Sequence, residues 1–410
     1  MNNEFYVDTE FEVANEENEE DLKQEVSLIN EAVIWATDWT TETLNMQLLK
    51  GNIDLRPQFQ RRDAWDDQRK SKLIESLILG FPVPPIVLAE IKCKRNSYVV
   101  VDGKQRLLSI RRFYAGSNLQ PNNNDSFEPL TLKGLDILDK LNGRSYNYVQ
   151  SNCREYIDSL DNQPIRTVVV KNWMNEEFLY AIFHRLNTGS KPLSPQELRQ
   201  SLMPGDFLTY LDDETAKSDV IMKMLNNKKA DPRMRDIELA LRYFAYKFSL
   251  DKYNGNLKDF LDLTCRNLNT QWCEKSEEIK KEFSELENAI NFSQEVFGVN
   301  SPFSRYTNGE SHSRFNRSIF EIFVFYFSVP AIREAISQKS VLLDAFKTLN
   351  DNSYFVDSVD TTTKTIERVY TRFSMFFNLL TELDDIKGKG IQIPKILCND
   401  GKLSLETVVS

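Results

Sequence analysis

The hydrophobic pattern of the chain changes near residue 205. Before that point, short runs of β-branched residues alternate with segments of helical spacing, whereas the long periodic segments after it are helical. Such a change predicts an α+β fold in which a mixed domain precedes an all-helical one. The 410 residues are enough for more than one domain. We expect an acidic tail over 1–30, a mixed domain over 31–205, a helical domain over 206–385 and a C-terminal tail over 386–410.

The mixed part has clear signals for the starts and ends of its elements. Gly51 and Gly80 stand where helices end, and Asp66 is suited to cap a helix start. The expected helices cover 41–50, 66–79, 135–141 and 176–186. The expected strands cover 86–90, 98–101 and 165–170. Residues 53–59 are expected to be extended, and residues 116–127 are expected to form a loop.

The helical part begins after an unusually complete start signal. Ser194, Pro195 and Glu197 supply an N-cap, a proline at the first helical position and a capping-box acid. Further helices are expected at 233–248, 275–296, 316–327, 341–349 and 363–383, with a strand at 391–393 before the chain frays.

Charge is distributed unevenly along the chain, whose net charge is −10. Residues 1–30 hold ten acids against Lys23, and residues 51–115 hold thirteen Lys and Arg against seven acids. An acidic segment therefore precedes a basic one. Either the tail is simply solvated, or it screens a site for anions.

Cysteine and histidine usage excludes several kinds of site. The five cysteines form no C-x-x-C pair, which argues against zinc and favours reduced thiols. His184 and His312 are the only histidines, which leaves little room for histidine-based metal sites or acid–base groups. The common phosphate-loop, dinucleotide and hydrolase-elbow motifs do not occur.

The most informative segment is a strand that runs directly into a glycine turn and a helix. Residues 98–101 lead into Asp102-Gly103-Lys104-Gln105-Arg106, which we call the Asp102 turn. Glycine lets a bound group approach the backbone, and a helix N-terminus attracts anions. Lysine and arginine in the first helical turn are repelled by the helix dipole unless an anion neutralises them. Alternatively, Asp102 only caps the helix and the two cations are solvated.

These residues resemble the N-terminal domain of GmrSD-type restriction systems, which is similar to the ParB and sulfiredoxin nucleotide-binding fold. The resemblance spans roughly residues 40–330 and rests on order and spacing. The matching motifs are Arg56-Pro57-x-Phe59-Gln60-Arg61, the helix from Leu73 to Leu77, Gly80-x-Pro82-x-Pro84-Pro85-Ile86, the Asp102 turn with Val101 and Leu107, Phe183-x-Arg185-Leu186-Asn187-x-Gly189, Glu197-x-Arg199, Arg235-x-x-Glu238-x-x-Leu241-Arg242 and Arg314-Phe315-Asn316.

The resemblance implies binding, and beyond it hydrolysis, of a nucleoside triphosphate in a bacterial antiphage or restriction system. Mg²⁺ would accompany the triphosphate. The catalytic group would be Asp102, Gln105 and Arg106, and the nucleotide-binding residues would be Gln60, Arg61, Asp102, Gly103, Lys104, Gln105, Arg106 and Asn187, with Arg61 as a charge-assisted phosphate donor.

Two departures from the family pattern affect the expected activity. Lys104 stands where the family's Asp-Gly-Gln-Gln-Arg motif has its first glutamine, so binding is better supported than hydrolysis. Family members often end in an HNH nuclease domain, and two distant histidines do not provide one. Either an effector or nuclease partner would then be needed for restriction, or the protein acts as a nucleotide-gated regulator.

Other residues have simpler interpretations. His184 is expected to be structural, the aromatic run from Phe320 to Phe327 to be core, and Trp35 with Trp39 at i, i+4 to form a packing face. Arg233, Arg235 and Arg242 are expected to pair with Asp231, Asp236 and Glu238 in preference to contacting a nucleic-acid backbone.

The alternative function is a non-catalytic DNA-binding or adaptor protein that uses the basic face of residues 51–115. A homo-oligomer is compatible with the sequence. The longest apolar run, from Ser318 to Ile332, is too short and too charged for a membrane span, and no secretory signal is visible, so a cytoplasmic protein without a membrane partner is expected.

Overall fold

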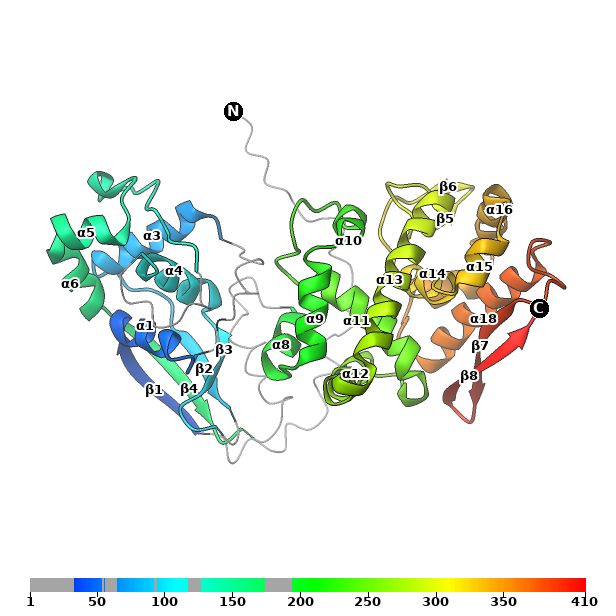
Figure 1. The fold of residues 1–410 in the computed structure, drawn as a ribbon, viewed down its shortest axis with the longest axis horizontal. Coiled ribbons are helices and arrows are strands. Elements are labelled where there is room, and N and C mark those ends of the chain that lie inside the picture. The colour runs from blue at the N-terminus through cyan, green and yellow to red at the C-terminus, as the bar shows by residue number, and fades with distance from the viewer. Residues whose placement is uncertain (1–32, 54, 56–64, 92–93, 117–126, 174–193) are drawn as a thin grey trace. The chain divides into compact units, whose positions relative to one another are not determined.

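The computed structural model describes residues 33–53, 55, 65–91, 94–116, 127–173 and 194–410. These residues divide into two compact units. The mixed unit contains the described residues up to Leu202 together with Pro232–Met234, and the helical unit contains Met203–Asp231 and Arg235–Ser410. The expected α+β class, with a sheet in the N-terminal region and a helical C-terminal part, is confirmed (Figure 1).

The mixed unit is organised around a four-stranded sheet with the order β1-β4-β2-β3. Its strands are β1 (Val33–Thr40), β4 (Pro164–Lys171), β2 (Ile86–Glu90) and β3 (Tyr98–Asp102). The central pair, β4 and β2, is parallel, and both outer pairs are antiparallel. The three strands that the β-branched runs predict are therefore confirmed, and β1 is an additional one.

The alternation of side chains along the strands buries both faces of the sheet. Ile86 and Leu88 of β2 point into the larger core, whereas Val87 and Ala89 point into a smaller core on the opposite face. The larger core is covered by α1 (Thr41–Leu49), α3 (Asp67–Ile78), α4 (Lys104–Tyr114), α5 (Tyr146–Asn152) and α6 (Arg154–Asn162) (Figure 1). The smaller core includes Leu198 of α8 (Pro195–Leu202), which contacts β3.

Local start and stop signals explain the helices that position the site. The Asp66 carboxylate accepts a hydrogen bond from the backbone N–H of Arg69 at 2.7 Å and so caps α3 as expected. Glu197 and Ser194 form the expected capping box at α8, with distances of 2.7 and 3.1 Å. Both signals are short-range, and both are confirmed.

The segment 135–141 was expected to be helical, and that prediction is wrong. Only Asp139–Leu141 forms a single 3-10 turn. The buried carboxylate of Glu75, on α3, accepts hydrogen bonds from the backbone N–H groups of Asp136, Ile137 and Leu138 at 2.7–3.1 Å. Because these N–H groups donate to a side chain far away in the sequence, the segment lies along α3 and does not form the expected helix.

The paired tryptophans also differ from expectation. Trp35 and Trp39 lie on strand β1, and Trp35 is 54% exposed. Trp39 alone packs against the core, where its ring meets that of Tyr98 edge to face at 5.7 Å.

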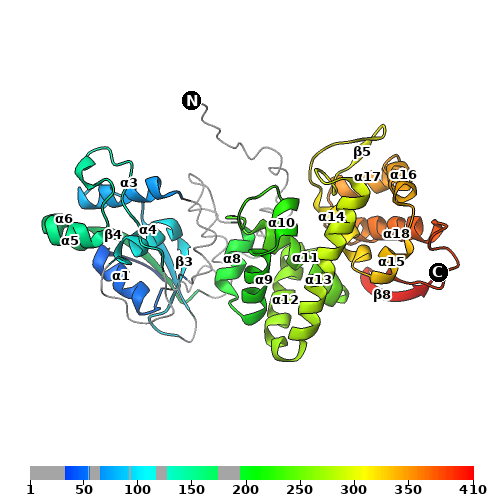
Figure 2. The same cartoon turned by 45° about the horizontal axis from the view of Figure 1, so that its top comes forward.

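The helical unit is built around one apolar helix, α14 (Arg317–Phe327), which is capped by Asn316. Its aromatic run is buried as expected. The helix packs against α11 (Arg235–Phe248), α13 (Trp272–Phe297), α17 (Ser353–Asp360) and α18 (Ile366–Glu382) (Figure 2). The helices of this unit are α9 (Asp206–Thr215), α10 (Asp219–Met224), α11 (Arg235–Phe248), α12 (Leu257–Thr270), α13 (Trp272–Phe297), α14, α15 (Pro330–Ala335), α16 (Lys339–Leu349), α17 (Ser353–Asp360) and α18 (Ile366–Glu382), with a 3-10 turn at Leu250–Lys252.

The C-terminal residues do not fray. Strands β7 (Gln392–Asn399) and β8 (Lys402–Val409) form an antiparallel hairpin that contacts α18. Ile393, Ile396 and Leu403 are buried there, so the segment expected to be a tail is held by its own apolar face. A second, short hairpin pairs β5 (Tyr306–Thr307) with β6 (Glu310–Ser311). No helix among the described residues has both the length and the apolar character that a membrane span requires.

Candidate functional site

The strand-to-helix turn predicted from the sequence is present, and it requires glycine. Asp102 ends β3, Lys104 begins α4, and Gly103 between them has φ 97° and ψ 11°. This left-handed conformation is costly for residues with a side chain. A Cβ at this position would also lie 3.0 Å from Cγ1 of Ile86. The turn therefore brings the backbone close to the start of β2.

Arg106 connects the three chain segments that meet at this turn. Its Nη2 donates to Oδ2 of Asp102 at 2.7 Å and to the carbonyl oxygen of Pro85 at 2.9 Å. Its Nε is buried and has no hydrogen-bond partner among the described residues. The arginine is thus held at the N-terminus of α4, and its buried Nε–H can donate to a further acceptor.

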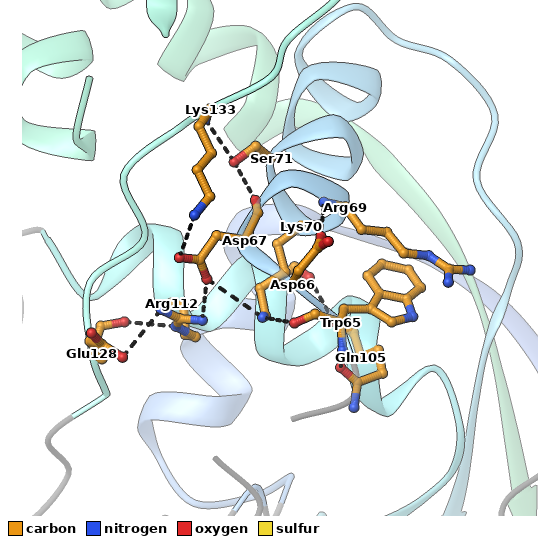
Figure 3. A network of polar contacts seen from close by, with 11 residues as sticks. Trp65, Asp66, Asp67, Arg69, Lys70, Ser71, Gln105, Arg112, Glu128 and Lys133 are labelled. Carbon is orange, nitrogen blue, oxygen red and sulfur yellow. Dashed lines mark hydrogen bonds and ion pairs between the residues drawn. The ribbon is translucent and has the colours of Figure 1, made fainter. Parts of the chain in front are cut away.

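Gln105 ties the turn to the residues that precede α3. Its Oε1 accepts a hydrogen bond from the backbone N–H of Trp65 at 3.3 Å. The Trp65 carbonyl in turn accepts from Nζ of the buried Lys70, and the Arg69 guanidinium lies over the Trp65 ring at 4.6 Å from its centroid (Figure 3). Gln105 therefore fixes the position of residues 65–70 relative to the turn.

A second network around Asp67 joins α3 to α4 (Figure 3). Its carboxylate lies 2.9 Å from Nη1 of Arg112 and 3.3 Å from Nζ of Lys133. Burial raises the pKa of Asp67, but the charges and hydrogen bonds of Arg112 and Lys133 outweigh it and leave the pKa below its usual value. Asp67 is thus held as an anion that anchors Arg112.

Lys104, the departure from the family motif, is buried and not solvated. Its side chain is 8% exposed, and its Nζ lies 3.9 Å from Oε1 of Glu197 on α8. The other oxygen of Glu197 lies 3.4 Å from Nη1 of Arg233. The sequence placed Glu197 in a capping box but did not connect it with the Asp102 turn, because the contact joins segments far apart in the chain.

The basic segment 51–115 does not present all its charge to solvent. Lys70, Lys104, Arg111 and Arg112 are all less than 9% exposed. Lys72 is exposed and pairs with Asp136 at 2.7 Å. The local excess of positive charge is therefore used in part to hold the mixed unit together, which weakens the case for a continuous basic face.

The other arginines expected to form ion pairs do so. Arg235 lies 2.7 Å from Asp231, and Arg242 lies 2.9 Å from Glu238. Arg242 also reaches the buried Glu321 on α14 at 2.7 Å, a partner that the local sequence did not indicate.

Three predicted site residues lie outside the described residues: Gln60, Arg61 and Asn187. His184, which was expected to be structural, also lies outside them. Within the described part of the chain, no group of three or more His, Cys, Asp or Glu could hold a metal ion. Four of the cysteines are described, and all four are free thiols as expected: Cys153, Cys265, Cys273 and Cys398.

The fold and the turn together define a mixed α+β module in which a glycine turn leads directly from a strand into a helix. Residues 45–204, which include the Asp102 turn and most of the mixed unit, match the family model of the GmrSD restriction endonuclease, N-terminal domain. The family expected from the motifs is confirmed over this segment, and it connects the chain with restriction or antiphage systems. No curated protein and no solved structure matched the chain in the two further comparisons.

Proposed function

We propose that the mixed unit binds a nucleoside triphosphate at the Asp102 turn and hydrolyses it. The observation that supports this most directly is the arrangement of Arg106, which Asp102 and the Pro85 carbonyl hold beside a left-handed glycine at a helix N-terminus. The protein would act as the nucleotide-dependent component of a restriction or antiphage system, together with an effector or nuclease partner.

The chemistry of the turn fits phosphate oxygens. A helix N-terminus carries partial positive charge, and Gly103 provides no side-chain cap that would occupy it. Arg106 brings a full charge and a buried Nε donor without a partner in the described residues. Since an unsatisfied buried donor is unfavourable, a phosphate oxygen that accepts from it would be bound more strongly than at an exposed arginine.

Mg²⁺ would come with the triphosphate and not from a site formed by the protein. Magnesium commonly keeps several waters and is held by one or two carboxylates plus the substrate phosphates. Asp102 is the carboxylate of the turn, and its side chain is 32% exposed, so it remains accessible. When bound, the metal would neutralise phosphate charge.

The three residues proposed for catalysis have different roles. Asp102 orients Arg106 and offers a carboxylate to the metal or to the attacking water. Arg106 stabilises charge on the phosphate oxygens. Gln105 is bonded through Oε1 to Trp65, so its contribution in this arrangement is to hold residues 65–70 beside the turn.

The test is calorimetric titration of ATP, GTP, CTP and UTP with Mg²⁺, followed by a phosphate-release assay. Arg106→Ala should weaken binding about tenfold or more, because it removes a charge-assisted donor. Lys72→Ala, which breaks an exposed ion pair of the same unit, is the matched control and should bind like the wild type. Absence of binding by the wild type would reject the proposal.

The alternative, a DNA-binding adaptor, gives a different signature. Binding to a phosphate backbone weakens steeply as salt is added. If the wild type binds duplex DNA in this way and binds no triphosphate, the adaptor function replaces the proposed one.

A further inference from the structure

A lysine is buried near the start of α3. Lys70 is 1% exposed, and its Nζ donates to the backbone carbonyl oxygen of Trp65 (Figure 3). Burying an ammonium group is costly unless polar partners replace the water around it. Buried ion pairs often contribute no more stability than apolar side chains of similar volume. Stability alone therefore does not explain a lysine at this position.

Asp67 also lies near Lys70, but its charge does not depend on this lysine. Nζ of Lys70 lies 3.7 Å from Oδ1 of Asp67, beyond the distance of about 2.7–2.9 Å in a hydrogen-bonded ion pair. The same carboxylate lies 2.9 Å from Arg112 and 3.3 Å from Lys133. Asp67 would therefore keep two closer cations if Lys70 were replaced. The hydrogen bond to the Trp65 carbonyl is the closer of these two contacts of Lys70.

The backbone of Trp65 connects Lys70 with α4. Its carbonyl oxygen accepts from Lys70, and its N–H donates to Oε1 of Gln105, the second residue of α4, at 3.3 Å. The bond through which Gln105 holds residues 65–70 also fixes Gln105 itself. Because an N–H has to meet the oxygen of the amide group, the bond determines on which side of the amide Nε2 and its N–H donors lie. Lys70 thus holds the backbone that orients the Gln105 amide.

Arg106, the next residue of α4, is held by other contacts. Its Nη2 donates to Oδ2 of Asp102 at 2.7 Å and to the carbonyl oxygen of Pro85 at 2.9 Å. Neither acceptor belongs to residues 65–70. A change at Lys70 should therefore displace Gln105 and leave Arg106 in place.

We propose that Lys70 is a positioning residue of the nucleotide site, which acts on hydrolysis through Trp65 and Gln105. The inference rests on the proposed function, because it assumes that a triphosphate is hydrolysed at the Asp102 turn. In that step water adds to the γ-phosphorus, the bond from phosphorus to the β–γ bridging oxygen breaks, and a nucleoside diphosphate, inorganic phosphate and a proton are released. Arg106 binds the phosphates, whereas the contacts of Lys70 keep the Gln105 amide oriented for this step.

The experiment measures hydrolysis and binding of ATP, GTP, CTP and UTP with Mg²⁺ by Lys70→Met. Methionine is of similar length but lacks the donor. The kcat should fall about tenfold or more, because a misplaced catalytic group loses transition-state interactions, while triphosphate binding stays within about twofold of the wild type. Lys70→Arg, which keeps a cationic donor, should recover part of the kcat.

Lys72→Met is the matched control. Lys72 also lies on α3, two residues further on, and forms an exposed ion pair with Asp136 at 2.7 Å. Its replacement should leave kcat and binding as in the wild type. Thermal unfolding of each variant shows whether a loss of activity reflects a loss of fold. If Lys70→Met does not fold, Lys70→Gln, which has a shorter polar side chain, takes its place.

A double-mutant cycle with Gln105→Ala shows whether Lys70 acts through Gln105. In the Gln105→Ala background, Lys70→Met should lower kcat by less than about twofold, because the amide that it orients is gone. A merely structural role would lower kcat by the same factor in both backgrounds. Hydrogen exchange at the Trp65 amide, measured without nucleotide, should be faster in Lys70→Met than in Lys72→Met and the wild type.

The outcomes separate this inference from the proposed function. If the wild type hydrolyses triphosphate and Lys70→Met has the same kcat, the role of Lys70 is rejected while the proposed function stands. Equal factors in both backgrounds of the cycle, or unchanged exchange at the Trp65 amide, reject it in the same way. If the wild type hydrolyses no triphosphate, the proposed hydrolysis fails, and the role of Lys70 fails with it.

Discussion

Nη2 of Arg106 lies 2.7 Å from Oδ2 of Asp102. Asp102 is the last residue of strand β3, and Arg106 follows it by one helical turn, in α4. The same nitrogen donates to the carbonyl of Pro85, the residue before β2. A positive charge in the first turn of a helix is unfavourable, whereas a carboxylate just before the helix is favourable. Asp102 therefore stabilises an arginine position that the helix alone would oppose, and the pair ties two strands and a helix together.

Asp102→Asn should separate binding from hydrolysis. Asparagine keeps an acceptor for Arg106 but removes a negative charge beside the proposed phosphate site. We expect phosphate release to fall about a hundredfold or more, while triphosphate binding without Mg²⁺ is retained. Single-turnover phosphate release and calorimetry measure the two quantities. A parallel loss of binding would show instead that Asp102 acts only through the position of Arg106.

Gly103→Ala tests the close approach at the turn. The left-handed backbone alone should cost about 1–2 kcal/mol of unfolding free energy. The added methyl group would also meet Ile86 Cγ1 at 3.0 Å and Nη2 of Arg106 at 3.3 Å, for about 1 kcal/mol more.

Gly143→Ala is the matched control for this comparison. Gly143 has φ 76°, and a Cβ there would meet nothing within 4 Å. Gly143→Ala should therefore lose the unfolding free energy that the left-handed backbone costs, without a close contact of the added methyl group. Urea denaturation of both variants measures the difference, and equal losses would contradict a specific close approach at Gly103.

The sequence predicted the Asp102 turn because its determinants are consecutive. A β-branched run, a glycine and a helical apolar stripe are local signals, and each acts within a few residues. The contacts of Lys104 with Glu197, and of Glu197 with Arg233, join residues far apart in the chain, so no local pattern indicates them. Of the two alternatives for Lys104, an anion partner or a solvated side chain, the structure contradicts the second, because it buries the lysine.

The wrong prediction of a helix at 135–141 has the same cause, a contact between residues far apart in the chain. Its apolar spacing is helical, but Glu75 from α3 binds three of its backbone N–H groups. Helical propensity is a weak preference, and hydrogen bonds that these N–H groups donate to a buried carboxylate outweigh it.

Glu75→Ala should consequently destabilise the mixed unit. Loss of a buried carboxylate that accepts three hydrogen bonds is expected to cost about 3 kcal/mol. Hydrogen exchange at Asp136, Ile137 and Leu138 should become faster than at other amides of the unit. Glu155→Ala, on the exposed face of α6, is the control and should change neither quantity noticeably. Unchanged exchange in Glu75→Ala would show that the segment is held by other contacts.

Glu321 is the central group of a buried ion cluster in the helical unit. Its two oxygens lie 2.7 Å from Nη1 of Arg242 and 2.7 Å from Nη2 of Arg372. Because Glu321→Ala would leave two guanidinium groups buried without it, we expect a loss of about 3–5 kcal/mol in unfolding free energy. Glu277→Ala, which breaks the exposed pair with Lys280, should cost less than about 1 kcal/mol. Denaturant unfolding of both variants and the wild type measures the two losses of unfolding free energy and distinguishes a large loss from a negligible one.

Asp231 should make the stability of the helical unit depend on pH in the acidic range. Burial raises the pKa of Asp231, but Arg235, through charge and hydrogen bonds at 2.7–2.8 Å, and Asn227 together bring it below the usual value. A carboxyl whose pKa is lower in the folded state stabilises the fold above its unfolded pKa of about 4.

That contribution is lost as the pH falls from about 5 through the lower, folded pKa, because the unfolded state takes up the proton at a higher pH than the folded state does. Asp231→Asn should therefore be less stable than the wild type at pH 7, and the difference should shrink as the pH is lowered. Urea denaturation between about pH 3 and pH 7 measures it, with the exposed Asp219→Asn as the control. A difference that stays constant over this range would show that Asp231 stabilises the unit through its shape and hydrogen bonds, and that its charge contributes little.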